Sequence, residues 1–337
     1  MKKRLLVIAV LLMAAFVCIT VLNGMDTELS PNEPSGSGTA ATDTADIKPS
    51  SKGSPYKFYF ERLTPVEKRA YNAIIEKIYD MPERIAVPKI DGKELDNVFS
   101  ALLFDNPDLF FLGRKCAVET RMWLTYFSVD YIVDKADIAD MKAQLERECE
   151  AFEQTLTDPG NQWRTELEIH DHVIDRCEYH DPEGDLIYSS SYGALVNGRA
   201  ACEGYSKAVK LLLDRAGIEN ALISGVSENG EGSGGAHMWN IVNIGGDYYH
   251  LDCTWDDPVS DDGGKLRMYT YFNLSDEMIS GTHRDFSYDF VCKSTAENYY
   301  IKTGTYFESY SRSSESRLTD IITKSVKNGR YQIQLRF

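Results

Sequence analysis

The clearest helical pattern in the chain begins at residue 202. Apolar residues recur near the helical period from Tyr205 to Ala216, and the pattern ends at Gly217, where a glycine commonly closes a helix. We therefore expect a largely buried helix with residue 202 in its first turn. The unpaired N–H groups and the positive dipole end at that position favour an anion.

Runs of strand-forming residues follow this helix. Residues 220–227, 237–244 and 248–255 have strand character, and a glycine-rich polar loop covers 228–235. Gly245 and Gly246 separate the last two runs, and this pair predicts a type I′ hairpin turn, in which both central residues need positive φ. In that register residue 244 pairs with 247 and residue 237 pairs with 254. Residues 237 and 252 then share one face of the sheet.

Three residues with complementary chemistry lie on these elements, in the order Cys202, His237 and Asp252. Acyl transfer by a thiol requires a thiolate nucleophile, an imidazole that accepts and returns the proton, and a group that holds the imidazole in one tautomer. We therefore predict a catalytic triad of Cys202, His237 and Asp252. The alternatives are a buried, inert cysteine and a different base, His250, which shares the face of His237.

The segments around this trio resemble the transglutaminase-like superfamily. The similar segments are Tyr192-Gly-Ala-Leu-x-x-Gly198, Cys202-x-Gly204-Tyr205, Gly217-Ile218, His237-x-Trp239-Asn240 and Asp252-x-Thr254-Trp255-Asp256-Asp257-Pro258. The resemblance implies an α+β fold with a papain-like core, in which a helix carrying the cysteine packs on an antiparallel sheet carrying the histidine and aspartate. Members of this superfamily include protein cross-linkers, peptidases and proteins that have lost activity, so the resemblance leaves the substrate open.

Other residues are candidates for supporting this site. The backbone N–H of Cys202 could donate to a developing oxyanion, and the hydroxyl of Tyr192 could add a second donor. Trp239 lies on the face of His237, and Trp255 could shield a hydrogen bond between His237 and Asp252 from water. For all three aromatic side chains, packing in the core is the alternative interpretation.

The sequence predicts no cofactor and no metal site. A group of possible zinc ligands has spacings that fit no standard pattern, and we interpret it as part of a scaffold helix with one apolar face: His170, His172, Cys177 and His180. Asp256 and Asp257 precede a proline and predict a turn in which aspartate side chains cap backbone N–H groups. Seven irregularly spaced cysteines indicate no disulfide pairing.

The N-terminal part of the chain predicts export. Residues 1–24 combine three basic residues with an uncharged apolar segment, typical of a signal peptide or membrane anchor. Cys18 lacks the preceding small residue that lipid modification needs. Residues 25–56 are rich in small and polar residues and predict a disordered linker. The protein is thus expected to be extracytoplasmic, either membrane-anchored or secreted, with membrane contact only through its N-terminal segment.

The remaining chain exceeds one average domain. We expect an accessory α/β region at 57–160, the catalytic core at 161–262 and a C-terminal extension at 263–337. The expected elements outside the core are helices at 64–79, 93–104 and 135–156, and strands at 123–133 and 331–337.

Charge limits the classes of partner. The formal net charge is −16, and it becomes −19 once residues 1–24 are removed. Such a chain repels nucleic acid, so we expect a protein or peptide substrate and, for the cross-linking alternative, an amine acceptor. The sequence favours an enzyme that hydrolyses peptide or glutamine-type amides. The alternatives are a cross-linking transglutaminase and a non-catalytic surface binding or assembly protein.

Overall fold

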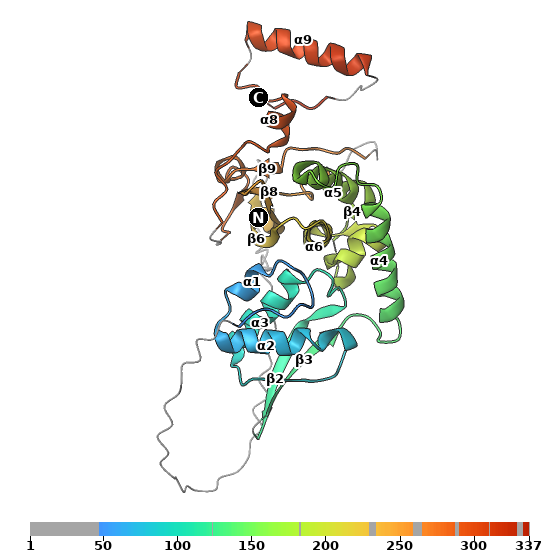
Figure 1. The fold of residues 1–337 in the computed structure, drawn as a ribbon, viewed down its shortest axis with the longest axis vertical. Coiled ribbons are helices and arrows are strands. Elements are labelled where there is room, and N and C mark those ends of the chain that lie inside the picture. Colours follow the sequence, from blue (N-terminus) through green and yellow to red (C-terminus); the bar gives the residue numbers. More distant parts are fainter. Residues whose placement is uncertain are drawn as a thin grey trace, which may run out of the picture. The chain divides into compact units, whose positions relative to one another are not determined.

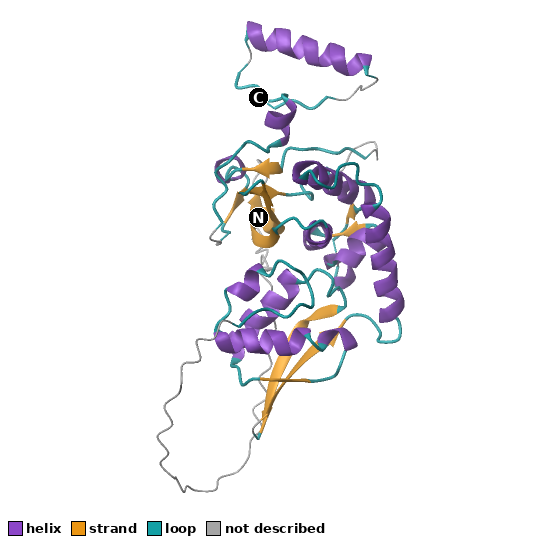
Figure 2. Ribbon diagram, viewed as in Figure 1, coloured by secondary structure: helices purple, strands orange, loops and turns teal. Residues whose placement is uncertain are grey.

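The computed structural model describes residues 47–122, 124–181, 183–228, 234–258, 265–286, 290–309, 311–328 and 333–336. This part of the chain folds as two compact units, and the boundary between them along the sequence lies between Ile138 and Ala139. Each unit has its own helices and its own sheet (Figures 1 and 2). We describe each unit by itself.

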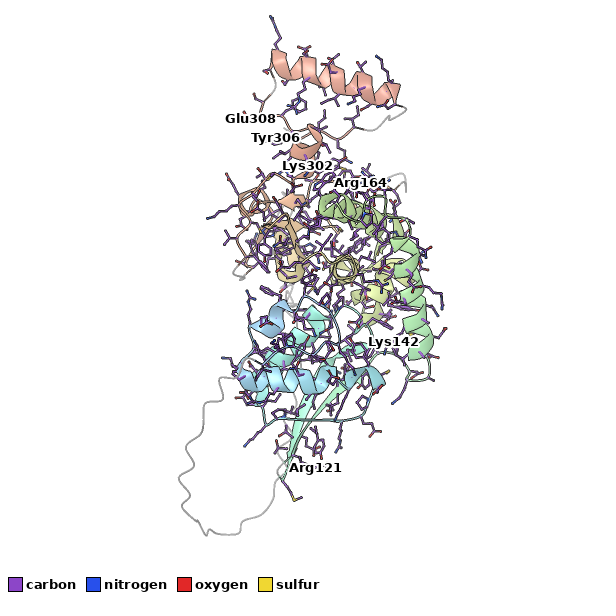
Figure 3. The ribbon with its side chains drawn as sticks, in the orientation of Figure 1. Arg121, Lys142, Arg164, Lys302, Tyr306 and Glu308 are labelled. Carbon is purple, nitrogen blue, oxygen red and sulfur yellow. The ribbon has the colours of Figure 1, made fainter. Side chains whose placement is uncertain are left out.

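The first unit packs helices with a three-stranded antiparallel sheet of order β1-β3-β2. Its elements are α1 (Phe58–Glu61), α2 (Pro65–Ile75), η1 (Ile78–Asp80), β1 (Ile85–Val87), α3 (Gly92–Asp105), β2 (Leu112–Arg121) and β3 (Leu124–Tyr131). Capping boxes begin α2 at Thr64 and α3 at Asp91 because each cap side chain accepts a backbone N–H in the first turn. Arg121 lies where β2 ends, at the tip of the long hairpin (Figure 3).

Part of the expected linker is ordered in this unit. The backbone N–H of Ser50 donates to Asn72 in α2, and that of Ser54 donates to Asn106 at the end of α3. The expectation of a disordered linker up to residue 56 is therefore wrong for residues 47–56. Composition missed this order because the segment is held by polar contacts and not by an apolar pattern of its own. Residues 1–46, including the predicted signal or anchor and Cys18, lie outside the described residues.

The second unit contains a five-stranded antiparallel sheet of order β10-β6-β7-β8-β9. Its strands are β4 (Glu178–Tyr179), β5 (Arg199–Ala200), β6 (Asn220–Glu228), β7 (Gly234–Ile244), β8 (Asp247–Leu251), β9 (Phe272–Leu274) and β10 (His283–Arg284). Its helices are α4 (Ile138–Glu153), α5 (Gln162–Arg176), η2 (Leu186–Ser189), η3 (Gly193–Asn197), α6 (Cys202–Arg215), α7 (Asp276–Ile279), α8 (Tyr299–Thr303) and α9 (Arg312–Lys327). The α+β fold class is as the sequence implied.

The helix predicted from residue 202 is α6, and it begins at Cys202 itself. Gly217 has a φ of +71° just beyond its end, and the backbone N–H of Ile218 returns to the carbonyl of Leu213. This left-handed C-terminal residue is the conformation that glycine adopts without steric cost. The inner side of α6 is buried, including Tyr205 and Val209.

The predicted hairpin also forms. Gly245 and Gly246 have φ values of +66° and +97°, and Ile244 pairs with Asp247 as expected. The expectation that the second strand reaches residue 255 is wrong, because β8 ends at Leu251. The Asp252 carboxylate accepts the backbone N–H groups of Thr254 and Trp255 at 3.0 and 3.2 Å. This local turn replaces the strand ladder.

The expected boundary at residue 262 does not separate structural units. Residues 263–337 supply β9 and β10, the two edge strands of the central sheet. The boundary expected at residue 160 also differs, since α4 falls almost entirely in the second unit. Residues 333–336 form only an isolated bridge between Arg336 and Tyr306, so the described part of the expected final strand is not a strand.

Within the described ranges, no helix is both long enough and apolar enough to cross a bilayer.

Candidate active site

The proposed nucleophile, Cys202, is the first residue of α6. It is partly exposed, whereas the other described cysteines are buried: Cys116, Cys149, Cys177, Cys253 and Cys292. No described side chain caps the helix at Ala201, so the positive end of α6 is available to an anion at the thiol. Gly204 lets this turn pack closely, because a Cβ there would lie 2.8 Å from the Tyr188 carbonyl oxygen.

Hydrogen bonds fix α6 against β7. The hydroxyl of Ser206 donates to the carbonyl of Met238 at 2.9 Å, and the amide of Asn240 donates to the carbonyl of Ser206 at 3.0 Å. The hydroxyl of Tyr205 donates to Asp257 at 2.6 Å and ties the same helix to the turn after β8. These contacts set the position of Cys202 relative to His237.

The imidazole of His237 lies between Cys202 and Asp252. Its Nε2 is 2.7 Å from Oδ2 of Asp252, and the Cys202 thiol is near enough to contribute to the rise in its pKa. Because Nε2 faces the carboxylate, Nδ1 is the nitrogen left for the thiol. Burial opposes a charged ring, but the Asp252 carboxylate and the Cys202 contact outweigh it and raise the pKa of His237 to about 10. The site therefore favours a protonated imidazole beside the sulfur.

The Asp252 side chain is fully enclosed. Burial alone would raise its pKa, but hydrogen bonds and charge interactions with His237 and His283 hold the pKa well below its usual range. Asp252 is therefore an anion that can orient and stabilise the His237 imidazolium. These contacts bring together the three residues that the sequence singled out.

His283 is a site residue that sequence reasoning missed. Its Nε2 lies 3.0 Å from the same Oδ2 atom of Asp252 that His237 contacts. The residue lies in the two-residue strand β10, 31 positions after Asp252, in a stretch without strand periodicity. The only sequence signal is that it is a histidine, and this gives no indication of its partner.

The two tryptophans pack around the imidazoles, as expected. Trp239 is fully buried and stacks on His237 with ring centroids 5.8 Å apart. Trp255 lies 6.1 Å from His237 and 4.9 Å from His283, so its ring helps to shield both hydrogen bonds to Asp252 from water. Gly225 in β6 provides the space for Trp239, since a Cβ there would lie 2.8 Å from its ring.

The alternative base, His250, is committed to other partners. Its Nδ1 accepts the indole N–H of Trp239 at 3.0 Å, and its Nε2 faces Asp276 at 3.0 Å. An indole nitrogen can only donate, so the imidazole proton is on Nε2. Burial lowers the pKa of His250 despite Asp276, which is consistent with a neutral ring. His250 is thus a hydrogen-bonded packing residue.

Tyr192 is packed in the core, which was the alternative to a role as oxyanion donor. It is buried, and its hydroxyl donates to the side chain of Gln144 in α4 at 2.8 Å. This contact directs the hydroxyl to a helix and gives no support to a role as an oxyanion donor. The backbone N–H of Cys202 remains the candidate donor.

The predicted scaffold helix is α5. Its apolar face is buried, as expected, through Leu167, Ile169, Val173 and Ile174. His170 is also buried and bridges two carboxylates, with Nδ1 3.1 Å from Asp171 and Nε2 3.2 Å from Asp256. Asp256 in addition accepts the backbone N–H of Tyr271. The aspartates after β8 therefore link the turn to α5 and α6.

Within the described part of the chain, two groups of side chains have the composition of metal ligands: His237 with Asp252 and His283, and His250 with Asp276 and Cys292. In the second group the Trp239 contact places the proton of His250 on Nε2, the atom that would bind the metal. In the first group both Nε2 atoms lie at hydrogen-bonding distance from one carboxylate oxygen. Hydrogen bonding accounts for both arrangements.

A comparison with protein-family models matches residues 150–253 to the transglutaminase-like superfamily. These residues form a transglutaminase-like core. The match includes Cys202, His237 and Asp252, together with α5, α6 and strands β6 to β8 of the sheet. It ends before β9, β10 and His283, which complete the sheet and the site.

Solved structures with weak similarity to this chain include the following three. One is described as a TGase, with 13% identity over 55% of this chain and 58% of that chain, and a TM-score of 0.29. A proposed cysteine protease from Cytophaga hutchinsonii has 14% identity over 43% and 56% of the two chains, and a TM-score of 0.27. A proposed protease from Parabacteroides distasonis has 14% identity over 46% and 40%, and a TM-score of 0.26. This chain spans less than two thirds of each of these chains. No curated protein matches it.

Proposed function

We propose that this protein is a thiol-dependent acyl-transfer enzyme that hydrolyses peptide or glutamine-type amide bonds. The observation that carries the proposal is the arrangement of His237, which lies 2.7 Å from Asp252 and near enough to the Cys202 thiol for each to raise the pKa of the ring. A buried structural cysteine needs neither partner.

The reaction follows from these positions. The thiol proton already resides on Nδ1 of His237, and the Cys202 thiolate attacks the amide carbonyl carbon to form a C–S bond. The backbone N–H of Cys202 at the helix start stabilises the oxyanion. The C–N bond then breaks, and the imidazolium returns its proton to the departing amine. Asp252 remains ionised and keeps His237 in one tautomer throughout.

Release of the acyl group completes the cycle. Water attacks the thioester with His237 as base, giving a carboxylic acid and the free thiol. A lysine-type amine in place of water would give an isopeptide bond, which is the cross-linking alternative. Hydrolysis is the simpler proposal because it needs no site for a second substrate. The acidic chain favours basic peptides among possible substrates.

We also propose an extracytoplasmic location. The support is the sequence alone: a basic start, an uncharged apolar segment and a polar stretch precede the folded units. A fusion of residues 1–56 to a reporter that is active only after export tests this. An inactive reporter would contradict it.

Labelling with iodoacetamide at pH 7, read by peptide mapping, tests the enzyme proposal. We expect rapid alkylation of Cys202 and slow alkylation of Cys177, because burial raises the pKa of Cys177 to about 12. Cys202→Ala should remove the rapid phase and all turnover. The matched control Cys177→Ala, which removes a buried cysteine at the end of α5, should retain both.

Product analysis separates the alternatives. Mass spectrometry of peptide and glutamine substrates with an added lysine analogue should give mainly hydrolysed product. Dominant isopeptide adducts would replace hydrolysis with cross-linking. An unreactive Cys202 and no turnover of a peptide library would contradict an enzyme and favour the binding or assembly protein.

A further inference from the structure

We propose that His283 is a positioning residue for the acyl transfer described above, acting on His237 through Asp252. The expected effect of His283 on catalysis rests on the proposed function. The hydrogen-bond geometry that carries it is independent of any substrate.

The argument begins with the acceptor capacity of Asp252. An ionised carboxylate has about four lone-pair positions. Oδ1 accepts the backbone N–H groups of Thr254 and Trp255, and Oδ2 faces Nε2 of His237 and Nε2 of His283. Four donors therefore saturate the carboxylate, and His283 supplies the last of them. Without it, Oδ2 would be held in place only by His237, the residue that it must orient.

The tautomer of His283 follows from its contact with Asp252. An ionised carboxylate can only accept, so Nε2 of His283 carries the proton that it donates to Oδ2. Nδ1 of His283 lies 2.8 Å from the Thr282 hydroxyl oxygen, and that hydroxyl also donates to the carbonyl of Ile279 at 3.3 Å. Thr282 thus links the ring of His283 to the end of α7.

The surroundings of His283 exclude a replacement by water. The side chain is fully buried, and three aromatic rings surround it with centroids 4.8 Å (Trp239), 4.9 Å (Trp255) and 5.4 Å (Tyr271) from its own. A leucine at this position would fill most of the space of the imidazole and leave little room for a water, so Asp252 would not recover its fourth donor from solvent.

The backbone around His283 is built to hold it there. Strand β10 pairs with β6: His283 is opposite Ser227, and Arg284 is opposite Val226, the neighbour of Gly225. A Cβ at Gly225 would lie 2.7 Å from the Arg284 carbonyl oxygen, so the glycine allows β10 to approach. This places a histidine from the C-terminal segment beside a carboxylate from the turn after β8.

Two substitutions separate donation from packing. Gln retains an N–H donor at about the position of Nε2, whereas Leu fills space without donating. We expect His283→Leu to lower the alkylation rate of Cys202 and the kcat for peptide hydrolysis by roughly tenfold, with KM nearly unchanged, as for other residues that orient a reactive histidine. His283→Gln should recover most of the loss. Equal losses in both variants, or none in His283→Leu, would overturn the proposal.

The matched control is His250→Leu, which removes a buried histidine on the other side of Trp239. It should lower stability and leave the Cys202 alkylation rate close to that of the wild type. A double-mutant cycle adds a direct test of the route through Asp252. In the Asp252→Asn background, His283→Leu should have no further effect on the rate, and full additivity would contradict the proposal.

A spectroscopic readout distinguishes this proposal from the proposed function. Nitrogen-15 NMR of labelled histidine reports the environment of each His237 ring nitrogen whether or not the protein turns over. We expect one set of His237 ring signals in the wild type and in His283→Gln, and more than one set in His283→Leu, because the ring is then no longer held in one orientation. An inert wild-type Cys202 would defeat the enzyme proposal alone, whereas unchanged His237 signals in His283→Leu would defeat the role of His283.

Discussion

The buried pair of Glu166 in α5 and Asn273 in β9 gives the sharpest prediction about stability. Asn273 Nδ2 donates to Glu166 Oε2 at 2.8 Å. Among the described residues, Glu166 Oε1 and Asn273 Oδ1 are both buried and have no partner while the carboxyl is ionised. A protonated Glu166 could donate from Oε1 to Asn273 Oδ1 and satisfy both atoms. We therefore expect Glu166 to be neutral in the folded protein.

The magnitude follows from the pKa. Burial raises the pKa of Glu166 from 4.5 to about 8, although the Asn273 hydrogen bond and His170 oppose this rise. Because the folded state binds the extra proton between these two values, stability falls as pH rises from about 4.5 to about 8 and is constant above. Each pKa unit corresponds to about 1.4 kcal/mol, so the upper limit of the loss is roughly 5 kcal/mol.

Glu166→Gln removes this titration and keeps the shape. Its amide can accept from Asn273 Nδ2 and donate to Asn273 Oδ1, so both contacts persist at every pH. The free energy of unfolding, measured by urea titration at pH 5, 7 and 9, should be similar for both proteins at pH 5. It should exceed that of the wild type by several kcal/mol at pH 9.

A second glutamate on the same helix provides the control. Glu168 is mostly buried, but its hydrogen bonds from Thr157 and Arg164 outweigh that burial and lower its pKa. Its contribution to stability is present above the unfolded pKa and is lost as pH falls, so Glu168→Gln should cost stability at neutral pH and less in acid. A difference between wild type and Glu166→Gln that stays constant from pH 5 to pH 9 would refute the acid–amide pair.

Two further predictions concern the site and its support. Asp252→Asn should leave the fold intact and lower the rate of acyl-enzyme formation, because an asparagine can select the wrong tautomer of His237. The loss should reach up to ~10⁴, as for an equivalent aspartate in serine proteases. Rapid-quench mass spectrometry measures the rate, and an unchanged rate would contradict the prediction. Burial opposes a charged His170, yet Asp171 and Asp256 raise its pKa to about 9. Its contribution, at most roughly 3 kcal/mol, is therefore complete below about pH 6.5 and lost as pH rises through 9. The stability difference between wild type and His170→Gln should shrink over that range in urea titrations, and a constant difference would exclude the charged bridge.

Much of the core could be predicted because its signals are local. The apolar period predicted α6, and two adjacent glycines predicted the hairpin turn and the register of β7 with β8. The end of β8 was missed because Asp252 uses its carboxylate to cap the following N–H groups. A side chain that competes with the strand ladder does not change the pattern of apolar residues.

The remaining contacts depend on pairings that no local pattern encodes. His283 reaches Asp252 because β10 pairs with β6, and a two-residue strand is too short to have a period. Glu166 meets Asn273 across 107 residues of chain. Such contacts are set by the order of strands in the sheet, which a single sequence does not reveal.

The edge strands explain why the functional unit extends beyond the transglutaminase-like match. Without β9 and β10, strands β6 and β8 would each expose a row of unpaired backbone N–H and carbonyl groups. The same segment carries His283, which completes the donors to Asp252, and Asn273, which pairs with Glu166 of α5. One stretch after residue 262 therefore supplies both edge strands of the sheet and a hydrogen-bond donor to the Asp252 carboxylate. Residues 265–286 are thus part of the same structural unit as the candidate site.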